Sequence, residues 1–332
     1  MIHYFKLTLM MLFLCGCGDL SNHSKTRQEW MEPNHKLKVL STTAMIDDLV
    51  RQIGGDTVDP YVLIKGELDP HSYQLVKGDD ELLARASLIF YNGLGLEHGP
   101  SLQNYLYNQR KALPLGNLIM NDNPELILSV LGTTDPHIWM DISLWSYTIP
   151  YIVNALSAQD PAHAEMYKEN GEKLLTELLE AHKQVKEELH QVPEDKRYLV
   201  TSHDAFNYFT RAYLADPHDR EWRYRFAAPE GLAPESQISA YHIHEIVQQL
   251  ERFHINVIFP ESNVSRDSIK KIVDAAKERG IKVKIADAYL YADAMGKPGS
   301  DGDTYIKMIQ HDAKTIAREL MHNQGKSTHD PS

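Results

Sequence analysis

Cysteine is nearly absent from this chain of 332 residues. Its only two cysteines, Cys15 and Cys17, both lie within the first 17 residues. The folded part of the protein therefore has no thiol with which to bind metal and no disulfide. Histidine, by contrast, occurs 17 times. Any metal site in this protein has to be built from histidine, aspartate and glutamate.

The chain also lacks a basic tract. Its net charge is −12, which argues against a nucleic acid or an anionic membrane surface as the binding partner. Hydrophobic residues make up 42% and charged residues 24% of the sequence, as in soluble proteins with a packed core. A length of 332 residues corresponds to about two domains.

The apolar run near the N-terminus, "LTLMMLFLCG", is too short to cross a bilayer and predicts a cleaved signal peptide over residues 1–16. It ends in "LCGC", which resembles a bacterial lipoprotein box with cleavage after Gly16 and a lipid on Cys17. Residues 17–35 are polar and aperiodic, and we interpret them as a tether between lipid and folded domain. The alternative is a plain secretory signal and a soluble periplasmic protein.

Patterns of strands and helices alternate in two parts of the chain, residues 36–160 and residues 193–325. This rhythm predicts an α/β protein with two βα-type lobes, each built on a parallel sheet. Between them, residues 161–192 have apolar side chains at helical spacing and no strand signal, so we predict one long helix that joins the lobes. Residues 326–332 are predicted to be a disordered tail.

The tripeptide Asp-Pro-His occurs three times, ending at His71, His137 and His218. Proline stiffens the backbone before the imidazole, and the aspartate can accept local hydrogen bonds that support the turn. His71 and His203 follow predicted strands and His137 precedes a helix, where loops of open α/β sheets form binding sites. His218 lies in a charged loop and is predicted to be a surface residue. From these residues alone, ordinary loop histidines remain an equal alternative to metal ligands.

Four stretches resemble the metal-ion solute-binding proteins of ABC importers, the TroA-like family (cluster A-I). They are "DPHSYQLVKGDDELLARASLIFYNGLGLEHGPSL", "DPHIWMD", "LVTSHDAFNYF" and "LYADAMG". Their amino-acid sequences most resemble the chlamydial, YtgA-type branch. The resemblance implies a metal site in the cleft between the lobes and a rigid connecting helix. Carried over by position, the ligands are His71, His137, His203 and Asp293.

The resemblance also implies a function. Members bind one divalent transition metal ion (Mn, Fe or Zn) as cargo and deliver it to an ABC permease with its cytoplasmic ATPase. We therefore expect a monomeric, periplasmic, lipid-anchored binding protein that is not an enzyme. Zinc-specialised members carry a histidine-rich loop before the second ligand, which is missing here, and manganese-specialised members tend to have Glu where this chain has His203. The sequence leaves the cargo metal open.

Two other classes of protein are alternatives to a metal-binding transport protein. A periplasmic metal-dependent hydrolase could use Glu261, at the end of a predicted strand, as a general base, but the sequence has no HExxH pair, and we interpret Glu261 as a support for a ligand. An adhesin-like surface lipoprotein would not need three histidines and an aspartate at sheet edges. For the fourth ligand, composition does not choose among Asp293, Asp301 and Asp303. We predict Asp303 to be the N-cap of the last helix.

Overall fold

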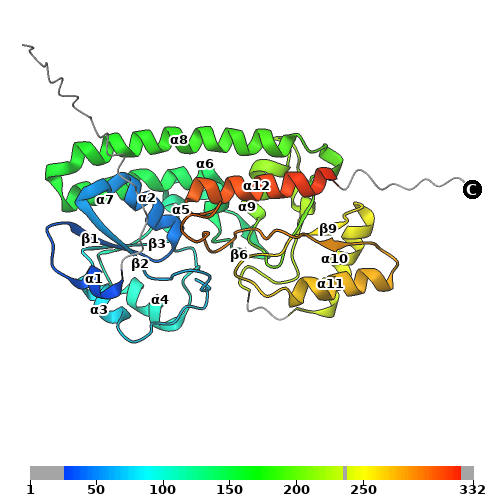
Figure 1. The fold of residues 1–332 in the computed structure, drawn as a ribbon, viewed down its shortest axis with the longest axis horizontal. Helices are drawn as coiled ribbons and strands as arrows, with labels where there is room; N and C mark the ends of the chain where they lie inside the picture. Colours follow the sequence, from blue (N-terminus) through cyan, green and yellow to red (C-terminus); the bar gives the residue numbers. More distant parts are fainter. Residues whose placement is uncertain (1–25, 235–237, 323–332) are drawn as a thin grey trace, which may run out of the picture.

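The chain forms two α/β lobes that lie side by side beneath a layer of long helices (Figure 1). The computed structural model describes residues 26–234 and 238–322. The predicted signal peptide, Cys17 and the predicted tail at 326–332 lie outside these residues. Within the described ranges, no helix has the length and apolar character needed to cross a membrane.

The first lobe is built on a parallel sheet with the strand order β2-β1-β3-β4. Because the strands are parallel, their carboxyl ends lie at the same edge of the sheet, where ligand-binding loops gather in such folds. In β1, Val39 packs into one hydrophobic cluster and Leu40 into another on the opposite face, so both faces of the sheet are covered. The strands are β1 Leu37–Ser41, β2 Val58–Val62, β3 Leu88–Tyr91 and β4 Ala112–Pro114.

The helices of this lobe follow the predicted alternation. The predicted stripe on α2, which contains Met45, Leu49 and Ile53, is fully buried. At the end of α2 a Cβ on Gly54 would lie 2.4 Å from the Val58 side chain, so only glycine allows the strand to return this closely. The elements are α2 Ala44–Gly54, α3 Asp79–Arg85, α4 Pro100–Tyr107, α5 Leu115–Asp122, α6 Ile142–Trp145, α7 Ile149–Gln159 and the short antiparallel pair β5 Ser129–Val130 and β6 Thr133–Thr134.

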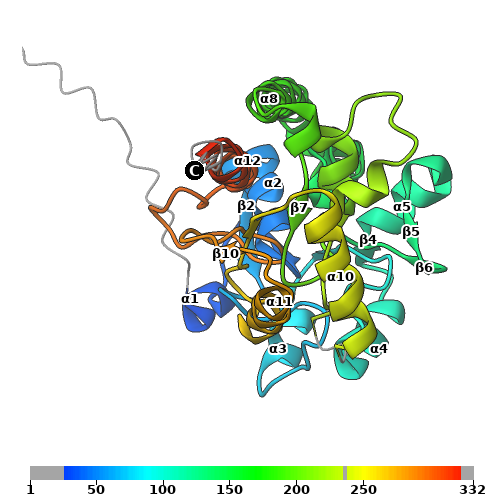
Figure 2. The ribbon, with the colours of Figure 1, turned by 90° about the vertical axis from the view of Figure 1, so that its right-hand side faces the viewer.

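The predicted long helix is α8, Ala164–His190, preceded by a 3₁₀ turn at Pro161–His163. Its 27 residues span about 40 Å at 1.5 Å per residue. It runs over both lobes, with α12, Tyr305–His322, beside it (Figure 1). Figure 2 shows the same layer on one side of the molecule and α3, α4 and α11 on the other.

The second lobe has two parallel strand pairs, β7–β8 and β9–β10. A hydrogen bond of 2.8 Å from the backbone N–H of Phe259 to the carbonyl of Val200 links the pairs. This part is α/β with parallel strands, as predicted. Its elements are β7 Leu199–Val200, α9 Asn207–Phe209, the π-helical turn Thr210–Leu214, β8 Phe226–Ala227, α10 Ala240–Arg252, β9 Val257–Ile258, α11 Asp267–Glu278 and β10 Lys284–Ile285.

One hydrophobic core is common to both lobes. It includes α2 and α7 of the first lobe, the buried face of α8, residues around β7 and α9 of the second lobe, and α12. Two smaller clusters belong to one lobe each, one beneath α3 and α4 and one between α10 and α11. The helical layer is therefore part of the core rather than a free spacer.

Part of the predicted tether is folded. Arg27–Met31 form the short helix α1, with a capping box between Thr26 and Glu29. Trp30 is fully buried, and its indole N–H donates to the carbonyl of Asp59 at 2.9 Å. Lys38 bonds the carbonyl of Trp30 and the carboxylate of Asp59. Arg27 also pairs with Glu81 at 2.6 Å. The buried tryptophan and these polar contacts hold the stretch to the lobe, and the stretch has no periodicity by which a helix could have been predicted.

We expect Leu178→Ala in α8 to lower the free energy of unfolding by about 2–5 kcal/mol, since it leaves a cavity in the common core. Leu178 is fully buried, whereas the neighbouring Leu179 is 46% exposed. The matched variant Leu179→Ala should therefore change stability by about 0.5 kcal/mol or less. Urea unfolding followed by circular dichroism measures both, and equal losses would mean that α8 is not held by its buried face.

Candidate metal centre

The four residues that the family resemblance singled out lie together in the structure. His71 follows β2, His137 precedes the 3₁₀ turn Ile138–Met140, His203 follows β7, and Asp293 follows β10. One potential ligand atom from each lies within 4.8 Å of all the others, and all four residues are buried. Two come from each lobe, so this cluster requires both.

The facing atoms are the Nε2 atoms of the histidines and the carboxylate of Asp293. The Nε2 atoms of His71 and His137 are 3.3 Å apart. Oδ2 of Asp293 lies 3.2 Å from Nε2 of His203 and 3.8 Å from Nε2 of His71, and its Oδ1 lies 3.6 Å from Nε2 of His137. Three nitrogens and one carboxylate thus surround a single point.

Carboxylates behind two of the histidines orient their rings. Nδ1 of His137 lies 2.7 Å from Asp135 Oδ1, and Nδ1 of His203 makes a short contact with Glu261 Oε2. A carboxylate accepts, so each Nδ1 carries a proton and Nε2 is the ring atom that faces the centre of the cluster. The other oxygen of Glu261 accepts from the backbone N–H groups of Ser202 and His203 at 2.8 and 2.9 Å.

The repeated Asp-Pro-His motif forms the turn that its composition suggested. Asp69 accepts from the backbone N–H of His71 at 2.8 Å and from the hydroxyl of Ser72 at 2.6 Å, and Asp135 accepts from the backbone N–H of His137 at 3.0 Å. The third histidine, His218, is exposed. It lies on the surface, as predicted, and takes no part in the cluster.

Of the three candidate aspartates, only Asp293 reaches the cluster. The carbonyl of the preceding residue accepts from the indole of Trp139 at 2.8 Å, which ties the segment to the first lobe. Asp301 is exposed. The prediction that Asp303 caps the last helix is wrong. Its carboxylate pairs with Lys307 and accepts from the N–H of Gly299.

The residue that caps α12 is Thr304, whose hydroxyl accepts from the N–H of Lys307 at 3.4 Å. Asp303 lies one position too early for this geometry, because an N-cap side chain reaches the N–H two or three positions ahead. The helix begins at Tyr305.

Charges within the cluster are strongly coupled. Burial lowers the pKa of His71 well below its ordinary value, because the Asp293 carboxylate does not outweigh the desolvation and the neighbouring histidines. Burial also opposes the charge of His203, but Glu261 and Asp293 hold its pKa well above the ordinary value. Burial would raise the pKa of Asp293, yet the imidazoles, His203 first, hold it below the usual range. One buried charge pair, His203 and Asp293, results.

This pair does not complete the cluster. Nε2 of His203 and Oδ1 of Asp293 are buried and have no hydrogen-bond partner within residues 26–234 and 238–322. Unpaired buried polar atoms are costly, and here two of them point to the same place. A metal ion at that point would take the place of the proton on Nε2 of His203 and would bind this nitrogen, the Asp293 carboxylate and Nε2 of the other two histidines, so the donor set fits a metal ion.

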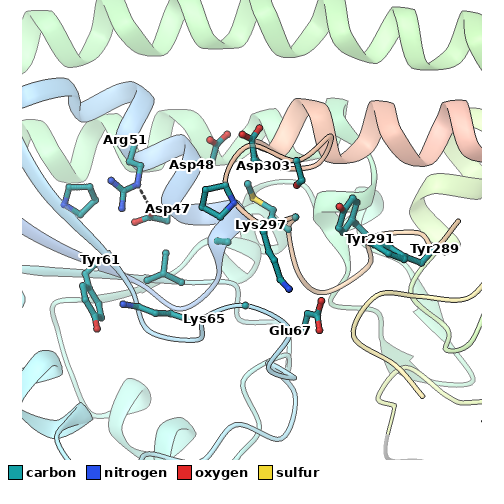
Figure 3. Close-up of a pocket in the computed structure, with 18 residues that line it drawn as sticks. Asp47, Asp48, Arg51, Tyr61, Lys65, Glu67, Tyr289, Tyr291, Lys297 and Asp303 are labelled. Atoms are coloured by element: carbon teal, nitrogen blue, oxygen red, sulfur yellow. Dashed lines mark hydrogen bonds and ion pairs between the residues drawn. The ribbon is translucent and has the colours of Figure 1, made fainter. Parts of the chain in front are cut away.

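A separate cavity of about 400 Å³ lies beside the cluster, between α2 and the segment 289–303 that carries Asp293. Figure 3 shows Asp47 and Asp48 of α2 on one side and Tyr291 and Lys297 on the other. None of the four clustered residues lines it. Part of the segment that carries Asp293 therefore borders this cavity, while Leu290 and Ala292 on the same segment are fully buried.

The sequence reasoning missed several buried polar residues in the loops around the cluster. Asn207, from the second lobe, donates to Asp135 Oδ2 at 3.0 Å. Glu97 is buried and accepts from Thr42 and from the N–H groups of Asn92 and Gly93. Only Asp135 had a local signal, since it belongs to the motif. The other contacts join segments that are far apart in the chain.

Together, the two α/β lobes, the long helix common to them and the buried His₃Asp cluster define a class: binding proteins that enclose a metal ion between two lobes. The chain matches the family described as zinc-uptake complex component A, periplasmic (ZnuA), over residues 39–319. It belongs to this family of metal-binding solute-binding proteins.

Several relatives are similar over nearly their whole length. The metal-binding protein YtgA of Chlamydia trachomatis is 39% identical over 320 residues, which cover 95% of this chain and 96% of YtgA. The manganese-binding lipoprotein MntA of Bacillus subtilis is 33% identical over 309 residues, covering 92% of this chain and 95% of MntA.

Solved structures agree. Fe(III)-bound YtgA from Chlamydia trachomatis superimposes with a TM-score of 0.81 at 40% identity, covering 86% of this chain and 98% of YtgA. The periplasmic zinc-binding protein TroA from Treponema pallidum has a TM-score of 0.77 at 30% identity, covering 86% of this chain and 99% of TroA. The family consists of transport proteins, so the protein is not an enzyme, and the hydrolase and adhesin alternatives are not favoured.

We expect Asp293→Ala to weaken metal binding at least tenfold, about 1.4 kcal/mol, because it removes the one carboxylate that faces all three histidines. The matched variant Asp303→Ala, in the same segment but paired with Lys307, should leave affinity nearly unchanged. Calorimetric titration of both variants decides the fourth ligand. A larger loss for Asp303→Ala would exclude Asp293.

Proposed function

We propose that this protein captures one divalent transition metal ion outside the cytoplasm, with His71, His137, His203 and Asp293 as ligands, and delivers it to an ABC importer. The observation that carries the proposal is the convergence of four buried ligand atoms within 4.8 Å. They come from four loops of two lobes. An ordinary hydrophobic core does not need polar side chains to meet in this way.

The donor set supports a borderline metal ion. Three imidazole nitrogens and one carboxylate suit Zn, Mn or Fe(II), whereas Mg and Ca prefer sites made of oxygen atoms. Four protein ligands leave little room for a reactive water, which suits the holding of a cargo ion. The named cargoes of relatives differ: iron in a YtgA structure, manganese for MntA and zinc for TroA. We propose that the cargo of this protein is one of these three metals.

The division of the proposed ligands between the two lobes suggests how the metal ion is released to the importer. Because His71 and His137 belong to one lobe and His203 and Asp293 to the other, a change in the relative position of the lobes removes half of the ligands at once. We propose that docking on the membrane permease, which works with a cytoplasmic ATPase, produces this change. The protein would act as a monomer, since the ligand set is complete within one chain.

We further propose that the protein is periplasmic and anchored to the membrane through a lipid on Cys17, after removal of residues 1–16. MntA is named a lipoprotein, which supports this. The proposed order is a tether from residue 17 that ends at α1, a first lobe to residue 160, the connecting helix at 161–192 and a second lobe at 193–325.

Metal should stabilise the folded protein, because an ion that binds only the native state adds RT ln(1 + [L]/Kd) to stability. At a free concentration of 100 times Kd this is about 2.7 kcal/mol, or a rise in melting temperature of about 5 °C. Thermal melts with Zn, Mn or Fe(II), and then with excess chelator, measure it. His137→Ala should abolish the shift, and the surface control His218→Ala should keep it.

If none of these metals raises the melting temperature of protein first stripped of metal, the proposed function is wrong. If the shift persists in His137→Ala but disappears in another ligand variant, the protein binds metal with a different ligand set.

The lipid anchor makes its own prediction. Cys17→Ser should move the protein from the membrane fraction to the soluble fraction, because no thiol remains at the proposed attachment point. Cys15→Ser is the matched control and should stay with the membrane. Fractionation followed by immunoblotting shows the outcome, and release of the Cys15 variant alone would place the lipid on Cys15.

A further inference from the structure

A fourth histidine lies beside the metal centre. The ring centroid of His98 is 5.6 Å from that of His71. Centroids of the three ligand histidines are 5.2, 5.4 and 6.3 Å apart, so His98 stands at the spacing of a ligand pair. Unlike those three, it is exposed, and it is not part of the four-residue cluster.

The hydrogen bonding of His98 leaves its Nε2 available for metal. Nδ1 lies 3.1 Å from the carbonyl oxygen of Gly95. A carbonyl only accepts, so Nδ1 carries the proton and the neutral ring has its lone pair on Nε2. Nδ1 of His137 and of His203 is likewise held from behind, so that Nε2 is the atom that faces the cluster.

Short contacts between two loops hold His98 in this position. A Cβ on Gly99 would lie 1.9 Å from the carbonyl oxygen of Tyr73, so the two backbones meet where only glycine fits. The hydroxyl of Ser101 accepts from the N–H of Leu75 at 2.8 Å, and Gln74 accepts from Ser101. The loop that carries His98 is thus joined to the loop that carries His71.

The buried carboxylate of Glu97 holds the other end of the same loop. It accepts from the Thr42 hydroxyl at 2.7 Å and from the N–H groups of Asn92 and Gly93 at 2.8 and 3.0 Å. An exposed histidine on a free loop samples many positions, but His98 follows directly after this anchored residue. Its place near the metal centre is built into the loop.

His98 also stands on the accessible side of the centre. Among the ligand histidines, His71 keeps 2% of its surface exposed, and His137 and His203 keep none. Of the three ligand rings, His71 is therefore the one with an edge at the surface. The side chain next to that point is an imidazole, which binds the same borderline metal ions as the buried cluster.

We propose that His98 is a transient metal ligand at the mouth of the site, which binds the incoming ion together with His71 before the ion moves to the buried cluster, and which receives it on the way out. This inference rests on the proposed function. An aqua ion loses its waters one or two at a time on this route, because imidazoles replace them in succession. His98 lowers the free energy of the transition state for entry and release. It does not change the free energy of the bound state, because the bound state does not include His98.

The test separates rates from affinity. Association of Zn²⁺ is followed by stopped-flow tryptophan fluorescence, since the ring of Trp139 lies 5.3 Å from that of His137, and release is followed after mixing with excess EDTA. We expect His98→Gln to slow both rates about tenfold and to change Kd by less than about twofold, because a step common to both directions is affected. His98→Asp, which supplies another ligand, should keep both rates near those of the wild type.

The matched control is His242→Ala, an exposed histidine on α10, which should change neither rate. Faster entry and release in His98→Gln would identify His98 as a steric barrier, and unchanged rates would mean that it does not bind the ion; either overturns the proposal. A large loss of affinity with unchanged association would make it a structural residue instead. If the wild type binds no Zn²⁺, Mn²⁺ or Fe²⁺ at all, the proposed function itself fails.

Discussion

Three imidazoles and one carboxylate are buried at a single point. Removing these polar groups from water costs free energy, and the surrounding structure has to offset that cost. Isolated buried charges are unfavourable by several kcal/mol even after relaxation. Part of that cost is offset within the protein, because His203 and Asp293 form a charge pair at 3.2 Å. Two atoms of this pair remain without hydrogen bonds among the described residues. A metal ion at the centre replaces the proton on Nε2 of His203 and binds this nitrogen and the Asp293 carboxylate, which offsets the cost of burying the polar cluster.

The supports of the cluster cross from one lobe to the other. Asp135 bonds the ring of His137 with one oxygen and Asn207 of the second lobe with the other. Trp139 of the first lobe donates to the carbonyl of Ala292, next to Asp293. A proposed metal ligand in one lobe is thus positioned partly by the other lobe. Because a ligand must be held within a fraction of an ångström, these contacts link the geometry of the site to the contact between the lobes.

The common core restricts how the lobes can separate. Residues of α2, α8, α9 and α12 belong to one continuous hydrophobic cluster. A wide hinge opening about α8 would expose part of this apolar surface to water, at a free-energy cost of about 25 cal/mol per Å². We therefore expect the change in the relative position of the lobes to be small. The cavity beside α2 borders part of the segment that carries Asp293 (Figure 3), whereas Leu290 and Ala292 of the same segment are buried in the common core.

Local patterns in the sequence determined the elements of this protein. The stripe at Met45, Leu49 and Ile53, the long amphipathic helix and the Asp-Pro-His turns were all predictable, because side-chain periodicity and turn chemistry act over a few residues. The family motifs pointed to the four ligand positions. Composition, however, did not choose Asp293 over Asp301 and Asp303, which share one short segment.

Only the tertiary structure decided which distant side chains meet. It brought Glu261 behind His203 and His98 beside His71, and it buried Trp30 of the supposed tether in the first lobe. Such contacts arise from the packing of whole elements against one another, and no pattern within a short stretch of chain records them. The sequence by itself therefore determined the strands, helices and turns. The environment of each ligand followed from the fold, because burial and charge depend on neighbours that are remote in the chain.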